Sequence, residues 1–433
     1  MPAIFILDLS HNKLSGPLTN LPEKGLALIL ANNIFNESIS RSLCRWTNLE
    51  YLDLSRNRLT GKIPKCLQNL KLLETMIFSS NLLSGVIPSY IANNHSSLYW
   101  LTLNGNNFTG EIPQGLGNLR ALRVLDVGDN QLFGNIPHWI GEKLTNLMVL
   151  KLHRNNFTGE IPESLCKMSK LQILDVAYNN LIGIIPHCLR ELNAMAKGAE
   201  ERYNHTLDPN ENVIQVMKGV DLEYTTNWDI VFNMDLSSNK LVGVIPVELT
   251  ALCMLLGLNL SNNHLSGMIP ESIGKMTRLE SLDLSGNKLT GMIPPSMAAL
   301  TFLSHLNLSD NKLLGRIPTG HQLQTLIDDP SIYAGNEDLC GPPLPNNCSD
   351  HQDPITMPKK KHKAAEELMK VWWFYLDIMS GFATGFWGVI GVLLLKKQWR
   401  WKIFRFVEKI MDKIYVAVMV TVVAKIKRGR EAV

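Results

Sequence analysis

The sequence lacks the residue patterns that mark an enzyme. Its 11 histidines are scattered, and the chain contains no H-E-x-x-H, G-x-S-x-G, P-loop or protein-kinase signature. Its 42 basic and 39 acidic residues give a net charge of only +3, and the basic residues concentrate after residue 358. We therefore predict no catalytic residues, no metal site, no cofactor and no nucleic-acid partner.

Long apolar runs are also lacking, with one exception. Residues 372–395 hold a single charge, Asp377. As a helix they would extend about 36 Å, enough to cross a hydrocarbon core of about 30 Å, so we predict one transmembrane helix there. The start of the chain shows no charged segment, apolar core or cleavage site of a signal peptide, and leads directly into a repeat. We expect a chain that is truncated at its N-terminal side.

The sequence is rich in one phrase, L-x-L-x-x-N-x-L-x-G-x-I-P. Its last four copies recur about every 24 residues, a period in the range of leucine-rich repeats. Eight earlier copies keep nearly the same spacing, and a longer gap between Asn179 and Asn239 divides the two groups. The asparagines that mark the copies are Asn12, Asn33, Asn57, Asn81, Asn106, Asn130, Asn155, Asn179, Asn239, Asn263, Asn287 and Asn311.

Each copy has the pattern of one solenoid coil. The alternating leucines of L-x-L predict a short strand with one buried face, and strands of successive coils then stack in parallel. The asparagine amide bonds backbone groups at the turn, glycine permits the bend, and the chain returns as a short helix. The fold class is therefore an α/β repeat solenoid with a parallel β-sheet on its concave face. The recurring strand aspartates are predicted to bond the backbone; they include Asp53, Asp126, Asp235 and Asp283.

The repeat pattern divides the chain into seven parts. They are eight repeats at 1–192, an insertion (called the island) at 193–233, four repeats at 234–325, a C-terminal disulfide cap at 326–349, a polar juxtamembrane linker at 350–371, the transmembrane helix at 372–395 and a short basic tail at 396–433. Loops that leave a solenoid are often its binding elements, so the island is a candidate recognition element. Its run Val213–Met217 is predicted to pair as a strand against the solenoid.

Six of the seven cysteines have a spacing that predicts disulfides. Cys44 and Cys166 each lie 11 residues after a repeat asparagine, and Cys66 and Cys188 each lie 9 residues after the next one. This shared phase puts each pair on adjacent coils and predicts the bonds Cys44–Cys66 and Cys166–Cys188. Cys340 and Cys348 bracket a proline-rich turn and are predicted to close the cap, which leaves Cys253 as a buried thiol. Disulfides indicate an oxidising compartment.

Eight N-x-[S/T] sequons precede the predicted membrane span, at Asn36, Asn94, Asn107, Asn156, Asn204, Asn259, Asn307 and Asn347. They place the N-terminal side outside the cell and predict a single-pass, type I protein of the plasma membrane. Asn259 and Asn307 fall on predicted strands, so we expect these two to stay unmodified.

Candidate contact residues follow from side-chain type at the two positions before each repeat asparagine. The early coils carry large or charged residues there, namely Arg56, His153, Arg154 and Tyr178, whereas the late coils carry small ones such as Ser237, Ser238, Ser285 and Gly286. Such anchors supply most binding energy, so we predict ligand contacts on the early coils and a partner protein on the late ones. In the membrane helix, Gly381, Gly385 and Gly388 form a small-residue stripe for helix packing.

Taken together, these features resemble the plant leucine-rich-repeat receptor-like proteins, kinase-less surface receptors that include the fungal-elicitor-responsive and Cladosporium-resistance groups. The resemblance rests on the plant-type phrase N-x-L-x-G-x-I-P, on four coils after an island, on the cap YAGNEDLCGPPLPNNC and on the segment WFYLDIMSGFATGFWGVIGVLLL. It implies an extracellular protein or peptide ligand, often microbial, a role in plant immunity, and signalling through adaptor and co-receptor leucine-rich-repeat receptor kinases.

The resemblance also implies a role for one island motif, Lys-x5-Tyr, which is formed here by Lys218 and Tyr224. A second island motif, Tyr-x8-Lys-Gly, is absent because Pro209 stands at its tyrosine position. The alternative is a truncated binder that does not signal, acting as a decoy or as an inhibitor of microbial wall-degrading enzymes.

Overall fold

The computed structural model describes residues 6–18, 25–93, 95–198, 213–217, 220–224, 230–320, 323 and 329–348, with the backbone alone for 213–217 and 220–224. Among these residues, no helix is long and apolar enough to cross a membrane. The predicted transmembrane helix at 372–395, with Gly381, Gly385 and Gly388, lies outside them, as do the linker after residue 349 and the basic tail.

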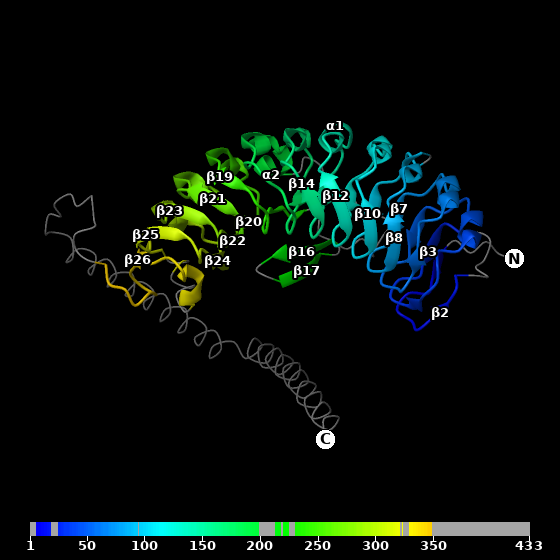
Figure 1. The fold of residues 1–433 in the computed structure, drawn as a ribbon, viewed down its shortest axis with the longest axis horizontal. Coiled ribbons are helices and arrows are strands. Elements are labelled where there is room, and N and C mark those ends of the chain that lie inside the picture. Colours follow the sequence, from blue (N-terminus) through cyan, green and yellow to red (C-terminus); the bar gives the residue numbers. More distant parts are fainter. Residues whose placement is uncertain are drawn as a thin grey trace, which may run out of the picture. The chain divides into compact units, whose positions relative to one another are not determined.

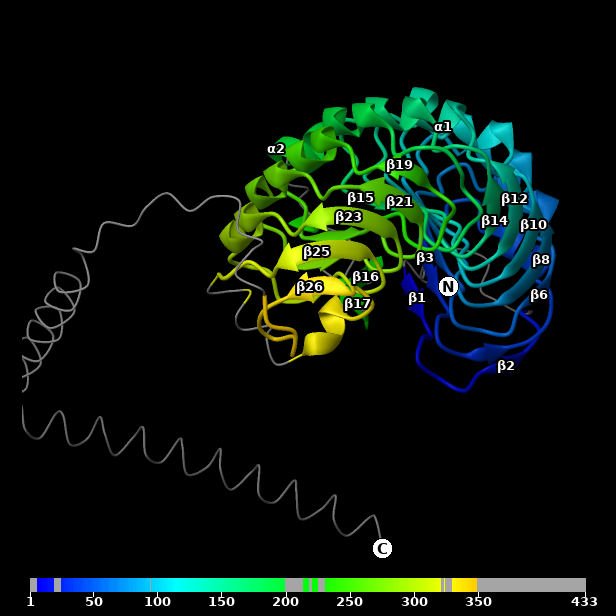
Figure 2. The same ribbon diagram turned by 60° about the vertical axis from the view of Figure 1, so that its left-hand side comes forward.

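The described coils stack into an arc whose concave side carries one parallel sheet of twelve strands (Figures 1 and 2). Each strand pairs in register with those of the adjacent coils, so residues at the same repeat position form rows across the sheet. The strands are β1 (Ile6–Asp8), β3 (Ala27–Ile29), β5 (Tyr51–Asp53), β7 (Thr75–Ile77), β9 (Trp100–Thr102), β11 (Val124–Asp126), β13 (Val149–Lys151), β15 (Ile173–Asp175), β18 (Asn233–Asp235), β20 (Gly257–Asn259), β22 (Ser281–Asp283) and β24 (His305–Asn307).

A second set of short parallel strands follows the turn of each coil, and we call its outward side the flank. The early flank strands are β2 (Ser15–Gly16), β4 (Ile34–Phe35), β6 (Thr60–Gly61), β8 (Leu82–Val86), β10 (Asn107–Gly110), β12 (Gln131–Asn135) and β14 (Asn156–Thr158). The late ones are β19 (Val242–Val244), β21 (His264–Gly267), β23 (Lys288–Met292), β25 (Lys312–Arg316) and β26 (Asp338–Cys340).

The convex returns are the short helices that the sequence predicts, and most of them are 3-10 helices of five residues. Most of these start after the Ile-Pro segment and end at a buried leucine or methionine, which leaves room for little more than one turn. They are η1 (Arg41–Arg45), η2 (Lys65–Asn69), η3 (Ser89–Ala92), η4 (Gln114–Asn118), α1 (Trp139–Lys143), η5 (Glu163–Lys167), η6 (His187–Glu191), α2 (Asn193–Lys197), η8 (Val247–Ala251), η9 (Glu271–Lys275) and η10 (Pro295–Ala299). A further 3-10 helix, η11 (Pro330–Tyr333), lies beside β24 instead, where the Leu308 amide donates to the Ile332 carbonyl.

The repeat asparagines form a buried hydrogen-bond ladder between the sheets, as predicted. The Oδ1 atom of Asn263 accepts from the Leu241 amide at 3.0 Å, and its Nδ2 atom donates to the carbonyls of Leu236, Leu260 and Ser261 at 3.0–3.2 Å. A single side chain thus satisfies backbone groups of two adjacent coils, which burial would otherwise leave unpaired. Asn336 continues this ladder beyond Asn311, a position that the repeat pattern did not identify.

The strand aspartates bond the backbone, which confirms their predicted role. In β5 the Oδ1 atom of Asp53 accepts from the amide of Ser55 at 2.8 Å, and Asp235 makes the same bond with Ser237 at 3.0 Å. Asp126 and Asp283 accept in the same way from residues two positions further on. The next residue adopts a positive φ near 50°, as at Arg56, and turns the chain toward the ladder asparagine.

Three disulfides join the predicted pairs, two of them predicted from the repeat phase and the third from the proline-rich turn of the cap. Cys44–Cys66 links η1 to η2, Cys166–Cys188 links η5 to η6, and Cys340–Cys348 closes the cap behind β26. Cys253 is a free thiol, and it is half-buried rather than fully buried.

One prediction about the island is wrong. Val213–Met217 forms β16, but this strand pairs in antiparallel fashion with β17 (Val220–Tyr224) and not with a solenoid strand. Only two residues separate the two strands, so they form a hairpin that satisfies its own ladder of backbone groups. The solenoid sheets instead pair across the insertion, β15 directly with β18.

Candidate functional site

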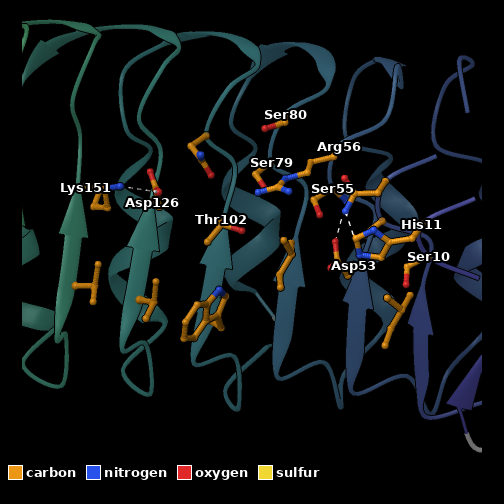
Figure 3. A pocket seen from close by; sticks show the side chains of 18 residues that line it. Ser10, His11, Asp53, Ser55, Arg56, Ser79, Ser80, Thr102, Asp126 and Lys151 are labelled. Atoms are coloured by element: carbon orange, nitrogen blue, oxygen red, sulfur yellow. Dashed lines mark hydrogen bonds and ion pairs between the residues drawn. The ribbon is translucent and has the colours of Figure 1, made fainter. Parts of the chain in front are cut away.

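The early coils form a pocket on the concave face, with a cavity volume of about 260 Å³. It extends over seven neighbouring strands, from β1 to β13, and Figure 3 shows its lining residues projecting from the strands and from the turns that follow them. Its floor is apolar toward the start of the strands, and its rim is polar where they end. The apolar members are Ile29, Ala31, Ile77, Trp100, Val124 and Val149.

The floor belongs to a second apolar cluster, separate from the leucine core. Trp100, Val124 and Val149 occupy the same position on β9, β11 and β13, and each is at most 1% exposed. Because the strands are in register, these side chains pack side by side as a continuous surface. These buried side chains form a continuous apolar base beneath the polar rim of the pocket.

The rim combines hydroxyl, amide and charged groups. Asp126 and Lys151 lie on adjacent strands with their charged atoms 3.6 Å apart (Figure 3). Burial raises the pKa of the Asp53 carboxyl, although bonds from Ser55 and the charge of Arg56 oppose the increase. Ser79, Ser80 and Asn104 extend the polar rim across the next two coils.

Beside this pocket, His153 lies at the centre of an ion-pair cluster. Its Nε2 atom is 3.0 Å from Asp129 and its Nδ1 atom is 3.2 Å from Asp175, while its side chain is only 14% exposed. Burial acts to lower the pKa of His153, but the Asp175 charge and the contacts with both carboxylates outweigh it and raise this pKa to about 10. His153 is therefore cationic near neutral pH and holds the two carboxylates in place.

The next strand adds a further buried carboxylate, Asp235, which pairs in register with Asp175 across the island junction. Burial and the neighbouring Asp175 charge raise the pKa of Asp235 to about 7. Asn259 donates to its Oδ2 atom at 3.2 Å. The concave face thus contains a continuous row of polar contacts where the early and late coils meet.

Arg154 and Tyr178 occupy the turn positions beside this cluster. The Arg154 guanidinium lies 5.2 Å from the Tyr178 ring centre and 3.4 Å from a carboxylate oxygen of Asp129. Both side chains are more than half exposed. The structure thus brings together three of the predicted contact residues, His153, Arg154 and Tyr178, and places the fourth, Arg56, in the rim of the pocket.

In the late coils a serine stands two positions before each ladder asparagine, the position of His153, and three of these serines bond their own strand. The hydroxyls of Ser261, Ser285 and Ser309 donate to the side chain two residues earlier, at 2.6–2.8 Å. These bonds engage the oxygens that would otherwise accept from a ligand.

The remaining predicted sites divide between described and undescribed residues. Lys218 lies outside the described residues, and Tyr224 ends β17, where only the backbone is described. Among the sequon asparagines, Asn94 and Asn204 also lie outside. The exposed ones are Asn36, Asn107, Asn156 and Asn347.

Asn259 and Asn307 lie half-buried on concave strands, and each accepts hydrogen bonds from the serine two residues further on. Residues that sequence reasoning missed are Trp100 and Asp129. Their signal was available, since Trp100 is the largest residue in its row and Asp129 directly precedes a ladder asparagine.

Two family models match the repeats. One, described as a leucine-rich repeat region, matches residues 28–193, and another, described as a leucine-rich repeat, matches residues 255–313. Together the two ranges cover more than half of the chain. The similar curated proteins include Receptor-like protein 54 of Arabidopsis thaliana, 39% identical over 83 residues, and Receptor-like protein EIX2 of Solanum lycopersicum, 38% identical over 90 residues.

The chain belongs to the plant leucine-rich-repeat receptor-like proteins. The matched segments cover 19% and 20% of this receptor-like protein, but only 10% and 8% of those two relatives. The sequence similarity to receptor-like proteins also supports the prediction that this chain is not an enzyme.

Solved structures extend the likeness over most of the receptor-like protein. The leucine-rich-repeat ectodomain of the Arabidopsis thaliana receptor kinase GASSHO1/SCHENGEN3, in complex with CASPARIAN STRIP INTEGRITY FACTOR 2, has a TM-score of 0.67 and 32% identity. The match covers 79% of this chain and 36% of that one. The plant peptide hormone receptor RGFR1, in complex with RGF2, has a TM-score of 0.58 and 29% identity over 72% of this chain and 48% of that one.

Proposed function

We propose that this receptor-like protein binds an extended peptide, or an extended segment of a protein, along the concave face of its early coils. The pocket from β1 to β13 carries the proposal, because it joins an apolar floor to a polar rim over seven adjacent strands. Peptide sites generally combine these two features, with apolar surface supplying affinity and placed polar groups fixing orientation.

The dimensions suit an extended chain. Strands in a sheet lie about 4.8 Å apart, so six spacings span about 29 Å, which an extended peptide of about nine residues would cover at about 3.3 Å per residue. Alternate side chains of such a peptide face the same way. One set would point toward the apolar base of the pocket, and backbone groups would lie near the rim residues Asn104, Ser79 and Ser55.

The ends of this path differ in charge. At the first coils the rim includes His11 and Arg56, and at the last it includes the Asp126–Lys151 pair. Beyond it, Arg154 and Tyr178 present an exposed cation and an aromatic ring of the type that anchors interfaces. In this proposal His153 acts as a positioning residue, because its ring is held between Asp129 and Asp175.

Two structural relatives, at 32% and 29% identity to this chain, are named as complexes with peptide hormones or factors. They support an extracellular peptide ligand as the class to test first. Lys218 and Tyr224 remain proposed island contacts for the same ligand.

The proposal extends to location and signalling. The apolar segment 372–395 would anchor the chain in the plasma membrane with the repeats outside, and the stripe of Gly381, Gly385 and Gly388 would pack against the helix of an adaptor kinase. The chain would signal through adaptor and co-receptor leucine-rich-repeat receptor kinases, the partners that its resemblance to receptor-like proteins implies. The three disulfides are those expected of an extracellular domain, and we propose a role in plant immunity.

A displayed library of random nine-residue peptides provides the test. The library is selected on the full chain in lipid nanodiscs, and the selected peptides are measured on two variants. Asn104→Arg should fill the pocket rim and weaken binding at least tenfold. Ser309→Arg, at the same repeat position after the last concave strand β24, should leave binding unchanged.

Selection that yields no peptide sensitive to Asn104→Arg would overturn the early-coil site. Peptides weakened only by Ser309→Arg would move the site to the late coils. Both outcomes can be read without any signalling partner.

A further inference from the structure

The flank of the late coils carries an exposed apolar stripe. On each flank strand the residues one, three and five positions after the ladder asparagine face outward, as the alternating burial of β23 and β25 shows. At the third and fifth positions, five apolar residues of the late flank and two of the adjoining coil, which follows β15, are 42–68% exposed. They are Ile182, Ile184, Val242, Val244, Met268, Met292 and Leu314.

The stripe is continuous because each fifth-position side chain lies against the glycine of the next coil. A Cβ atom on Gly243 would come within 3.0 Å of Ile184, and one on Gly267 would come within 2.9 Å of Val244. Met268 and Met292 lie in the same way against the glycines of the following two coils. Contiguous exposed apolar surface of this kind marks interaction sites in soluble domains.

The early flank differs at the same positions. Its exposed apolar residues Leu82, Val86 and Phe133 are interrupted by polar coils that carry sequons. Asn107 pairs opposite Ser84, between Leu82 and Val86, and Asn156 pairs directly opposite Phe133. Glycans on these two asparagines would cover the early apolar residues. No described residue of the late flank is a sequon asparagine, since Asn259 and Asn307 lie on the concave strands.

Charge borders the late stripe on both sides. Lys240, His264, Lys288 and Lys312 occupy the first flank position of successive coils, and all four are exposed. On the far side, where the chain enters the convex helices, stand Glu248 and Glu271. Glu248 contacts His187 at 2.9 Å and Glu271 accepts from the Ser296 amide, and each carboxylate keeps a second oxygen.

We propose that the late flank is a dimer interface that binds a second copy of this chain. A two-fold axis along the direction in which the coils stack would bring the stripes face to face and reverse the strand direction of the partner. The lysine border of one copy would then lie beside the glutamate border of the other, with Lys240 near Glu248 and His264 near Glu271. Such an isologous contact is the commonest arrangement of protein dimers.

The same axis keeps the C-terminal ends of both copies pointing in one direction, as two chains anchored in one membrane require. An axis along the strands would instead place the lysine borders against each other, where like charges repel. The interface lies on a different surface from the proposed peptide pocket, so the dimer forms without ligand.

Glycan insertion gives the sharpest test, since one substitution at a first flank position creates a sequon. His264→Asn yields Asn-Leu-Ser on the late flank, and Arg58→Asn yields Asn-Leu-Thr at the matching position of the early flank. The full chain, with a fluorophore after Val433, is counted at the plant-cell surface by single-molecule photobleaching. A mobility shift confirms each added glycan.

The unmodified chain and Arg58→Asn should bleach predominantly in two steps, and His264→Asn in one. A paired charge substitution checks the apolar contact without a glycan. Val244→Glu with Met268→Glu should weaken dimerisation at least tenfold, whereas Val86→Glu, at the same flank position of an early coil, should not.

A cysteine placed at the centre of the interface tests the symmetry. In a Cys253→Ser background, Thr290→Cys should form a disulfide between two copies, while Thr60→Cys, at the same flank position of an early coil and also exposed, should not. The proposal is overturned if the unmodified chain bleaches in one step, if glycosylated His264→Asn still bleaches in two, or if Thr290→Cys fails to cross-link. Larger heteromers with one labelled copy would also contradict it.

Discussion

The early coils, from β1 to β15, and the late coils, from β18 to β26, share one internal design and present different outer surfaces. Both have the asparagine ladder and a leucine core. On the concave face, the early coils form a pocket with an aromatic and charged lining, whereas the late coils carry small side chains such as Ser238, Ser285 and Gly286 at the matching turn positions. On the flank, sequons and polar residues separate the exposed apolar residues of the early coils, whereas the late coils carry a continuous apolar stripe. In a repeat protein, therefore, outward positions can change function while the inward positions keep the stack.

The strongest way to challenge this comparison is to damage the shared ladder in each half. Asn106→Ala in the early coils and Asn263→Ala in the late coils each remove four hydrogen bonds and leave buried backbone groups unpaired. We expect each to lower the free energy of unfolding by about 3–4 kcal/mol. Denaturant unfolding of the purified chain measures both, with exposed Gln131→Ala as the control. Loss of a buried network should lower the free energy of unfolding strongly in both halves. If one of the two variants loses no more stability than Gln131→Ala, the two halves do not share this scaffold.

A smaller effect is expected at the boundary between the halves. The pKa of Asp235 is raised to about 7, so the folded state holds this proton more tightly than the unfolded state, and stability should fall as pH rises from about 4 to about 7. The cationic His153 adds a stabilising contribution that is complete below its unfolded pKa and is lost as pH rises toward about 10. The protein should therefore be more stable at pH 5 than at pH 8.

Replacing Asp235 with the amide that later strands carry at this position separates the two contributions. Asp235→Asn should stabilise the chain at pH 8 by about 2–3 kcal/mol and remove the slope between pH 4 and 7, while leaving the His153 contribution. Asp283→Asn, in the same row but half-exposed, is the matched control. Melting temperatures across this pH range provide the measurement, and a slope unchanged in Asp235→Asn would refute the assignment.

The smallest expected effect concerns the early rim. Arg154 stacks on Tyr178, whereas late coils carry Asn262 and Ser238 at the equivalent turn positions with the same positive φ. The late residues can therefore be placed in the early rim without new backbone strain, as Arg154→Asn and Tyr178→Ser. A double-mutant cycle should give a coupling energy of about 0.5–1 kcal/mol. Additive effects of the two substitutions would mean that the stack contributes nothing to the rim.

The inward positions were predictable from the sequence because the repeat makes every coil the neighbour of the next. The strands, the ladder asparagines, the backbone bonds of the aspartates and the cysteine pairs all follow from one period. Asn336 escaped prediction because the leucine phrase before it is lost, and because one extra residue separates it from the leucine and glycine that follow, Leu339 and Gly341. The ladder thus extends further than the apolar pattern.

The outward positions were less predictable, since side-chain type does not reveal which neighbours satisfy it. His153 was expected to meet a ligand, but aspartates on both adjacent coils engage it. The partner of the island strand was predicted wrongly because the insertion occurs only once. No second copy in the chain indicates which strand it pairs with. The late stripe was missed because each coil contributes only one or two exposed apolar residues. They form one continuous surface only because the flank strands of five coils are stacked in register.

The junction beneath the island has a consequence for how this protein can change. The Oδ1 atom of Asn239 accepts from the Leu181 amide, 58 residues earlier in the chain, with the same 3.0 Å distance as ladder bonds between consecutive coils. The hydrogen bonds between these two coils therefore do not depend on the length of the segment that separates them in the sequence. Doubling a flexible loop costs only about 0.6 kcal/mol in closure entropy, so segments of quite different size and composition can be exchanged there without refitting the coils. Insertions with different binding residues can therefore be accommodated at this junction while the rest of the receptor-like protein stays folded.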